Sequence, residues 1–227
     1  MNKKKIIKIC LIVLALILVL ALVYMIRNYI IAKNIIEKNV AKALQSESIH
    51  TKTIIKEGDN VREIFDNYKK DDKELTINVM HSEGNDIETT IATYIHGTNK
   101  NTYYDNKSGK FVQQETVESV PEITEEQLYA DLENENNLTT FLSSAFTTFK
   151  VVEYNGKDCY LIEKSNLPIF KDFENGNDKN EIYVDKESGL IIKVVNDDIT
   201  TEYEYEFDNV NDDIFVEPDI NQYESYM

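Results

Sequence analysis

The chain has 227 residues and is strongly acidic, with 41 Asp and Glu residues against 24 Lys and Arg and a formal net charge of −17. This balance excludes nucleic acid as a partner, because binding to a phosphate backbone depends on clustered Lys and Arg. The two cysteines, Cys10 and Cys159, do not predict a disulfide within one domain, because Cys10 falls in an apolar segment at the start of the chain. The folded part must therefore be held together by a hydrophobic core.

An uncharged apolar run, ICLIVLALILVLALVYMI, occupies residues 9–26. At a rise of 1.5 Å per residue, about 18 residues nearly cover a hydrocarbon core of roughly 30 Å. A secretory signal peptide has a shorter apolar region that ends in small residues at a cleavage site, whereas this run ends in bulky ones. We therefore expect a cytoplasmic tail at residues 1–5 and an uncleaved transmembrane helix at residues 6–28.

Basic residues flank the apolar run on both sides, so a simple count does not orient it. The lysines before the run form a tight cluster on a very short N-terminus, and long domains translocate largely regardless of their charge. We expect a single-pass protein of the cell membrane with a cytoplasmic N-terminus and an extracytoplasmic C-terminal domain. The abundance of Asn, Lys and Ile favours a bacterial envelope protein.

Apolar residues recur near helical spacing through residues 29–46, as at Ile31, Ile35 and Ile36, which predicts that the helix continues as a stalk. The pattern leaves open whether this stalk packs on the domain, packs on a partner helix, or lies at the membrane surface. After residue 46 the apolar period changes to two, which predicts β-strands. The expected strands cover residues 50–57, 75–81, 87–96, 101–104, 110–117, 150–154, 157–163, 181–185, 190–195 and 201–207.

Two helices are expected between the two groups of strands. Thr124 and Gln127 form a capping pattern ahead of a helix at residues 125–135, and Ile123 is placed to pack on Leu128. A second helix is expected at residues 138–149, where a stripe of apolar residues serves either as core or as the lining of a ligand cavity. These elements predict an α+β fold: a curved antiparallel sheet covered by two helices, forming one domain at residues 47–227.

Strict alternation marks the last predicted strand, where Tyr203, Tyr205 and Phe207 share one face. The intervening residues Glu202 and Glu204, with Glu206, are expected to face water. No pattern predicts an enzyme. The three histidines lack metal-ligand spacing, the chain has no glycine-rich phosphate loop, and Cys159 is expected to be a small buried side chain. We expect no catalytic residue, no metal and no cofactor.

Four segments of the second half resemble the LolA-like superfamily of outer-membrane lipoprotein carriers: VEYNGKDCYLI at residues 152–162, IYVDKESGL at 182–190, YEFDNV at 205–210 and FVEP at 215–218. The chain is similar to that superfamily as a divergent, membrane-anchored member. The resemblance implies a half barrel whose apolar hollow, covered by helices, accepts acyl chains. It implies the following ligand-binding residues: Tyr203, Tyr205 and Phe207 on the sheet, and Leu128, Leu132, Phe141 and Phe146 on the cover.

The expected function is therefore to bind a hydrophobic ligand, either a lipid or a lipoprotein acyl chain, in a cavity between sheet and helices. An uncleaved anchor would prevent the domain from shuttling between two membranes, as the carriers do. The alternative is a protein-interaction or regulatory module of the cell envelope, without enzymatic activity and with a filled core, whose partner is another envelope protein.

Overall fold

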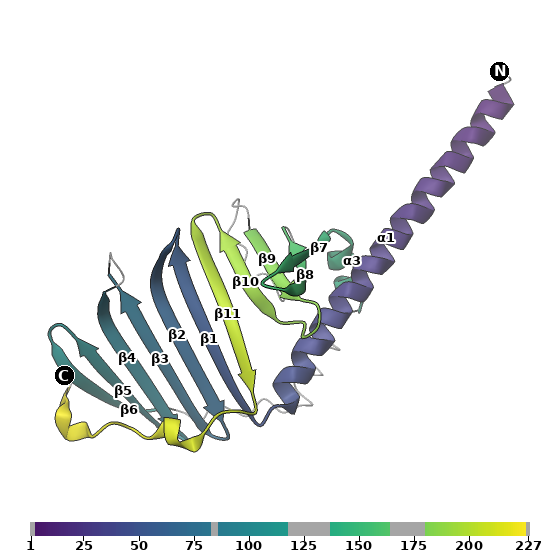
Figure 1. Cartoon of the computed structure of the whole chain (residues 1–227). Coiled ribbons are helices and arrows are strands. Elements are labelled where there is room, and N and C mark those ends of the chain that lie inside the picture. The colour runs from purple at the N-terminus through teal and green to yellow at the C-terminus, as the bar shows by residue number, and fades with distance from the viewer. Residues whose placement is uncertain (1–2, 83–85, 118–136, 164–179, 226–227) are drawn as a thin grey trace.

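The structure is a computed structural model of the chain, and it describes residues 3–82, 86–117, 137–163 and 180–225. One long helix precedes a broad sheet in which neighbouring strands are mostly antiparallel (Figure 1). The elements are α1 (Lys3–Gln45), β1 (Ser48–Glu57), β2 (Asn60–Lys70), β3 (Lys73–His81), β4 (Ile87–His96), β5 (Asn99–Asn106), β6 (Gly109–Thr116), α3 (Asn137–Ala145), β7 (Phe149–Tyr154), β8 (Lys157–Ile162), β9 (Asn180–Asp185), β10 (Ile191–Asn196), β11 (Ile199–Phe207), η2 (Asp212–Phe215), η3 (Ile220–Gln222) and β12 (Glu224–Ser225).

The described strands form a single 12-stranded sheet in the order β12-β6-β5-β4-β3-β2-β1-β11-β10-β9-β8-β7. Strand β11 lies in the middle and joins the meander β1–β6 to the second group of strands. Only β12, which pairs with β6, runs parallel to its neighbour among these strands. The predicted α+β class with an open antiparallel sheet is confirmed. Strand β2 is an addition, because no strand was expected at residues 60–70.

Helix α1 is continuous over 43 residues and passes through two different environments. Its segment Lys5–Asn39 is long and apolar enough, by length and composition, to cross a membrane. Large apolar side chains between residues 6 and 26 are exposed, whereas Asn28, Ala32 and Ile35 are buried. The change from exposed to buried side chains therefore falls close to Arg27.

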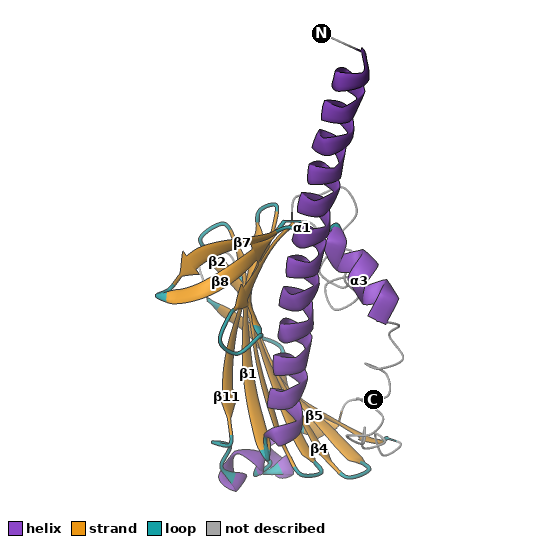
Figure 2. Ribbon diagram, turned by 90° about the vertical axis from the view of Figure 1, so that its right-hand side faces the viewer, coloured by secondary structure: helices purple, strands orange, loops and turns teal. Residues whose placement is uncertain are grey.

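The second half of α1 lies across one face of the sheet (Figure 2). Of the three alternatives for residues 29–46, the structure shows a helix packed on the domain. The residues that α1 contributes share a hydrophobic core with strands β7–β10, and this α1 core consists of Ile31, Ala32, Ile35, Phe149, Ile162, Ile182, Val184 and Val194.

Helix α3 packs on α1 and lies beyond it from the sheet (Figure 2). The rings of Tyr29 and Phe141 meet edge to face at 5.6 Å between centroids. The helix ends at Ala145 and not at residue 149 as predicted, because Phe149 is buried in the α1 core and begins β7. The other predicted helix, at residues 125–135, lies outside the described residues.

The opposite face of the sheet carries a second core. Glu206 pairs with His50, which pairs with Tyr68. Tyr68 in turn pairs with Leu75, so all four side chains share the face opposite to Tyr205. The C-terminal segment at residues 208–225 crosses this face and completes the core. This C-terminal core contains Leu75, Tyr94, Tyr103, Val112, Val210 and Phe215.

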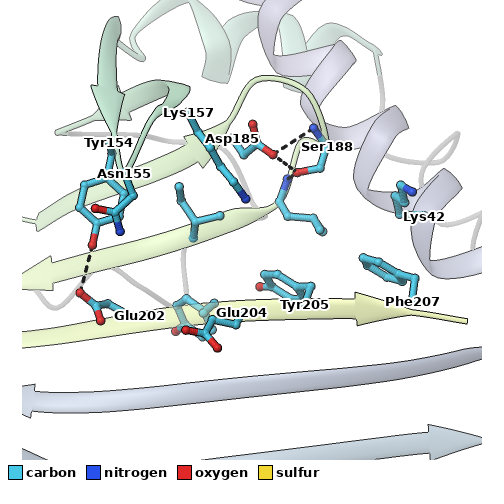
Figure 3. Close-up of a pocket in the computed structure, with 13 residues that line it drawn as sticks. Lys42, Tyr154, Asn155, Lys157, Asp185, Ser188, Glu202, Glu204, Tyr205 and Phe207 are labelled. Atoms are coloured by element: carbon cyan, nitrogen blue, oxygen red, sulfur yellow. Dashed lines mark hydrogen bonds between the residues drawn. The ribbon is translucent and has the colours of Figure 1, made fainter. Parts of the chain in front are cut away.

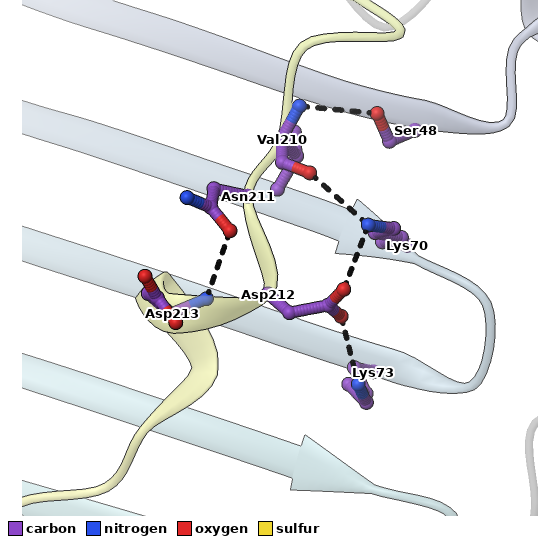
Figure 4. Close-up of polar contacts among 7 residues, drawn as sticks. All are labelled: Ser48, Lys70, Lys73, Val210, Asn211, Asp212 and Asp213. Atoms are coloured by element: carbon purple, nitrogen blue, oxygen red, sulfur yellow. Dashed lines mark hydrogen bonds and ion pairs between the residues drawn. The ribbon is translucent and has the colours of Figure 1, made fainter.

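Polar contacts hold the C-terminal segment against the sheet (Figure 4). The Asp212 carboxylate accepts from Lys70 Nζ at 3.0 Å and from Lys73 Nζ at 2.9 Å, which ties the segment to β2 and β3. The Val210 N–H donates to Ser48 Oγ at 3.2 Å. The two lysines lower the pKa of Asp212, chiefly through the hydrogen bond from Lys73.

Candidate pocket between helix α1 and strand β11

A pocket of about 420 Å³ lies where α1, the turn between β9 and β10, and β11 come together (Figure 3). This volume falls in the range usual for small-ligand sites, roughly 300–1,000 Å³. Its lining combines apolar and aromatic side chains with charged ones. The lining residues are Lys42, Tyr154, Asn155, Lys157, Asp185, Ser188, Leu190, Ile192, Glu202, Tyr203, Glu204, Tyr205 and Phe207.

A row of stacked rings from β11 borders the pocket. Tyr203 and Tyr205 stack at 6.4 Å between centroids, and Tyr205 and Phe207 stack at 6.3 Å with their planes only 8° apart. The Lys42 ammonium lies 5.3 Å from the centroid of the Phe207 ring, within the range of a cation–π contact. Burial raises the pKa of Tyr205, so its hydroxyl stays neutral at physiological pH. The row therefore offers a continuous apolar surface with one cation at its end.

The turn between β9 and β10 is organised by Asp185. Its carboxylate accepts hydrogen bonds from Ser188 Oγ at 2.6 Å and from the Glu187 N–H at 3.1 Å. Burial by itself would raise the pKa of Asp185, but these hydrogen bonds outweigh it and lower the pKa. The side chain is therefore a buried, charged acceptor that fixes the shape of the turn.

The same turn is held against α1. Lys38 Nζ donates to the Lys186 carbonyl oxygen at 2.6 Å. Gly189 has φ +75°, and a Cβ atom there would stand 2.8 Å from Lys38 Cβ and 2.9 Å from the Ile35 carbonyl oxygen. Only glycine fits this contact, because it combines a left-handed backbone with the closest approach to the helix.

One glutamate of β11 departs from the expectation that all three face water. Glu202 is half-buried, accepts from Lys56 Nζ at 2.6 Å and accepts from the Tyr154 hydroxyl at 3.0 Å. Burial opposes ionisation of Glu202, but these hydrogen bonds outweigh it and lower its pKa. The prediction was wrong for Glu202 because the β7–β8 hairpin brings Tyr154 over this face. Glu204 and Glu206 are exposed, as expected.

The structure brings together some of the predicted ligand-binding residues and separates others. Tyr203, Tyr205 and Phe207 line the pocket. Phe141 instead packs on Tyr29, and Phe146 is 72% exposed, so neither lines it. Leu128 and Leu132 lie outside the described residues. A ligand-binding role for these residues remains a prediction.

Sequence reasoning missed Lys42, Leu190 and Ile192 as pocket residues. Lys42 reaches Phe207 because the predicted stalk docks on the sheet, which its own sequence pattern does not indicate. Ile192 lies at a β-bulge between Ile191 and Lys193, and the sequence contains no signal that predicts this bulge. Cys159 is completely buried, as expected. Among the described residues, no three His, Cys, Asp or Glu side chains gather where they could hold a metal ion.

No protein-family model and no curated protein matches this chain. Several solved structures do match it. A LolA superfamily protein of Nitrosomonas europaea is one of them. It is 10% identical, with a TM-score of 0.28, and the match covers 82% of this chain and 97% of that one.

Two further matches are to larger chains. MucB, solved in complex with MucA(peri), is 8% identical with a TM-score of 0.32, and the match covers 82% of this chain and 60% of that chain. PNGF-II is 10% identical with a TM-score of 0.30, and the match covers 80% of this chain but only 31% of that chain. At these TM-scores the likenesses carry no argument about this chain.

Proposed function

We propose that the protein is a membrane-anchored, extracytoplasmic binding domain whose pocket between α1 and β11 receives the hydrophobic part of a ligand. The observation that carries this proposal is the stacked row of Tyr205 and Phe207 beside a pocket of about 420 Å³. Stacked rings present apolar area with little conformational freedom to lose on binding. The apolar part of such a ligand would lie along this row, which ends at the cation of Lys42.

The anchoring part of the proposal rests on the first half of α1. A helix that is apolar all round needs apolar surroundings, and the described part of the chain leaves those side chains uncovered. A bilayer supplies such surroundings over residues 6–26. Burial of Asn28 supports a membrane surface close to Arg27.

The same helix sets the distance between the pocket and the membrane. Lys42 follows Arg27 by about 15 residues, so at 1.5 Å per residue the pocket stands roughly 22 Å from the membrane surface along α1. A ligand that fills the pocket would therefore be drawn well out of the bilayer or arrive from outside it.

Photolabelling tests the ligand part of the proposal. The full chain in nanodiscs would be irradiated with a fatty acid that carries a diazirine, and the labelled residues mapped by mass spectrometry. The full chain is required because Ile31, Ala32 and Ile35 belong to the α1 core, so removing α1 would remove part of that core. We expect labels on β11 and on the β9–β10 turn. Labels confined to residues 6–26 would contradict the proposal.

A matched pair of variants sharpens this experiment. Phe207→Ala should weaken labelling of β11 by about tenfold, corresponding to about 1.4 kcal/mol, because it removes the ring at the end of the row. Phe146→Ala should leave labelling unchanged, because that ring lies outside the pocket. Equal loss in both variants would mean that the label follows exposed rings in general.

Cysteine labelling on intact cells tests the topology. The native thiols give little background, since Cys159 is buried and Cys10 lies within the proposed span. A cysteine in place of the exposed Glu153 should react with an impermeant maleimide from outside the cell. A cysteine in place of Lys5 should react only after permeabilisation. The reverse pattern would place the domain in the cytoplasm.

A further inference from the structure

Strands β10 and β11 are paired over only part of the length of β11. Strand β1 pairs with β11 along its whole length, from Ile199 to Phe207. Strand β10 pairs with β11 only at residues 199–202. The last part of β11, residues 204–207, therefore has no strand beside it on the β10 side within the described part of the chain, and Figure 3 shows the two ribbons diverging there.

We call the gap between residues 190–192 and residues 204–207 the split. The pocket lies in the split, against the edge of β11. Successive side chains of a strand point to opposite faces, so a pocket on one face would be lined by alternate residues only. Here Glu204 and Tyr205, which point to opposite faces, both line it, together with Leu190 and Ile192 from the diverging chain. The pocket thus borders the backbone of β11 as well as its side chains.

Two hydrogen bonds identify the backbone groups that face the split. The Asp208 N–H donates to the Ser48 carbonyl oxygen at 2.9 Å, and the Gly58 N–H donates to the Asp198 carbonyl oxygen at 3.0 Å. In an antiparallel pair the bonded residues alternate, so even-numbered residues of β11 bond β1 and odd-numbered ones point away. Among the described residues, neither the Tyr205 nor the Phe207 backbone has a hydrogen-bond partner on the β10 side.

Helix α1 and a β-bulge flank the split. Strand β10 has a bulge against β9 between Ile191 and Lys193, next to the residue where its pairing with β11 stops. Lys38 and the close approach of Gly189 hold the preceding turn on α1, while Lys42 rests on Phe207 at the other side of the split. The two sides are therefore both fixed to one helix, at positions one turn apart.

We propose that an extended peptide segment of a partner protein enters this split and adds a strand to the edge of β11. The inference names the ligand class of the pocket and rests on the proposed function, in that the pocket must open to a ligand. An unpaired strand edge is a template for such addition, because backbone groups supply the affinity and neighbouring side chains the specificity. The N–H and C=O groups of Tyr205 and Phe207 would form the new ladder.

The surroundings of the split specify the peptide. Its residues beside Tyr205 and Phe207 would share the face of those rings and of α1, so apolar side chains fit there. Its alternate residues would stand beside Glu204, which is exposed and has no ion pair among the described residues. With a net charge of −17 for the whole chain, a peptide that alternates apolar and basic residues is favoured.

Backbone methylation of a probe peptide tests the inference without changing the protein. The probe is an acetylated, fluorescein-labelled heptapeptide of alternating lysine and valine, titrated with the full chain in nanodiscs of phosphatidylcholine and followed by anisotropy. Two control peptides carry N-methyl groups on alternate backbone amides. In one control the odd-numbered amides are methylated, and in the other the even-numbered ones, so each control blocks one hydrogen-bonding edge of the peptide strand. We expect one methylated peptide to bind about tenfold more weakly and the other to bind like the parent, because only one edge meets β11.

Equal binding of all three peptides would reduce the interaction to charge attraction and overturn the inference, as would the absence of binding. Glu204→Lys should weaken binding of the parent peptide about tenfold. Glu187→Lys, at an exposed position on the nearby turn, should leave binding unchanged. Equal loss of binding in both variants would again indicate unspecific charge attraction. If the diazirine fatty acid labels β11 while no peptide binds, the proposed function stands and this inference fails. If neither binds, both fail.

Discussion

Asn28 Nδ2 donates to the Thr147 carbonyl oxygen at 2.7 Å, joining residues that are 119 positions apart in the sequence. Asn28 is completely buried, and it is the first residue of α1 after the exposed apolar stretch and Arg27 to pack inside the domain. The contact therefore fixes the domain to the helix close to the proposed membrane surface.

Asn28→Ala should lower the free energy of unfolding of the domain by about 1–3 kcal/mol, because it removes the donor to a buried carbonyl. Urea unfolding of the full chain in phosphatidylcholine vesicles, followed by tyrosine fluorescence, would measure it, since the chain has 14 Tyr and no Trp. Asn34→Ala, at an exposed position of the same helix, is the control. An equal effect of the two substitutions would show that the contact contributes nothing specific.

Gly189→Ala should destabilise the fold by about 2–4 kcal/mol, through backbone strain at a left-handed φ and through overlap with α1. Gly156→Ala is a close match, because Gly156 has φ +74° but nothing within 4 Å of the added Cβ atom. It should cost only about 1 kcal/mol. The difference between the two unfolding free energies measures the contact of the turn with α1, and no difference would mean that the turn is not held there.

Ser188→Ala should make the free energy of unfolding less dependent on pH in the acidic range. The folded pKa of Asp185 is lowered, so its contribution is present above the unfolded pKa, about 3.9, and is lost as the pH falls through the folded pKa. Removing the Ser188 hydroxyl moves this pKa back towards its ordinary value. The gap in unfolding free energy between wild type and Ser188→Ala should therefore narrow between about pH 6 and about pH 3.

The control for this experiment is Ser225→Ala, which removes an exposed hydroxyl. Its effect should be small and the same at every pH. A gap between wild type and Ser188→Ala that stays constant across the range would show that the hydroxyl does not act through the ionisation of Asp185.

Phe215→Ala should cost about 3–5 kcal/mol, because it empties part of the C-terminal core, whereas Val216→Ala should change stability by no more than about 0.5 kcal/mol. The two residues are adjacent, but Phe215 is 3% exposed and Val216 is 71% exposed. Urea unfolding would compare them directly. Similar losses would mean that the C-terminal segment is not packed as described.

The sequence predicted most strands because strict alternation, as at Tyr203, Tyr205 and Phe207, is produced by few other structures. It did not predict β2, where apolar and charged side chains are mixed on both faces: Glu63 and Phe65 share one face, Ile64 and Asp66 the other. Both faces of the sheet are covered in places, so an alternating pattern could not develop there. The C-terminal core was missed for a similar reason, since residues 208–225 have no period.

The split itself could not be predicted from the sequence. It lies beside a bulge at one residue, Ile192, and depends on contacts such as that between Lys38 and Lys186, which are 148 positions apart. Neither leaves a local pattern. What the sequence did provide was the aromatic row, because that row is a property of one strand.

Because α1 is continuous from Lys3 to Gln45, no hinge separates its apolar first half from the half that packs on the domain. A helix whose apolar length exceeds the local bilayer thickness accommodates the difference by tilting. Because the same helix bears both the Gly189 turn and Lys42, such a tilt would lean the whole sheet with it and bring one rim of the split nearer to the lipid. The thickness of the surrounding bilayer would thus select the direction from which a partner strand can approach.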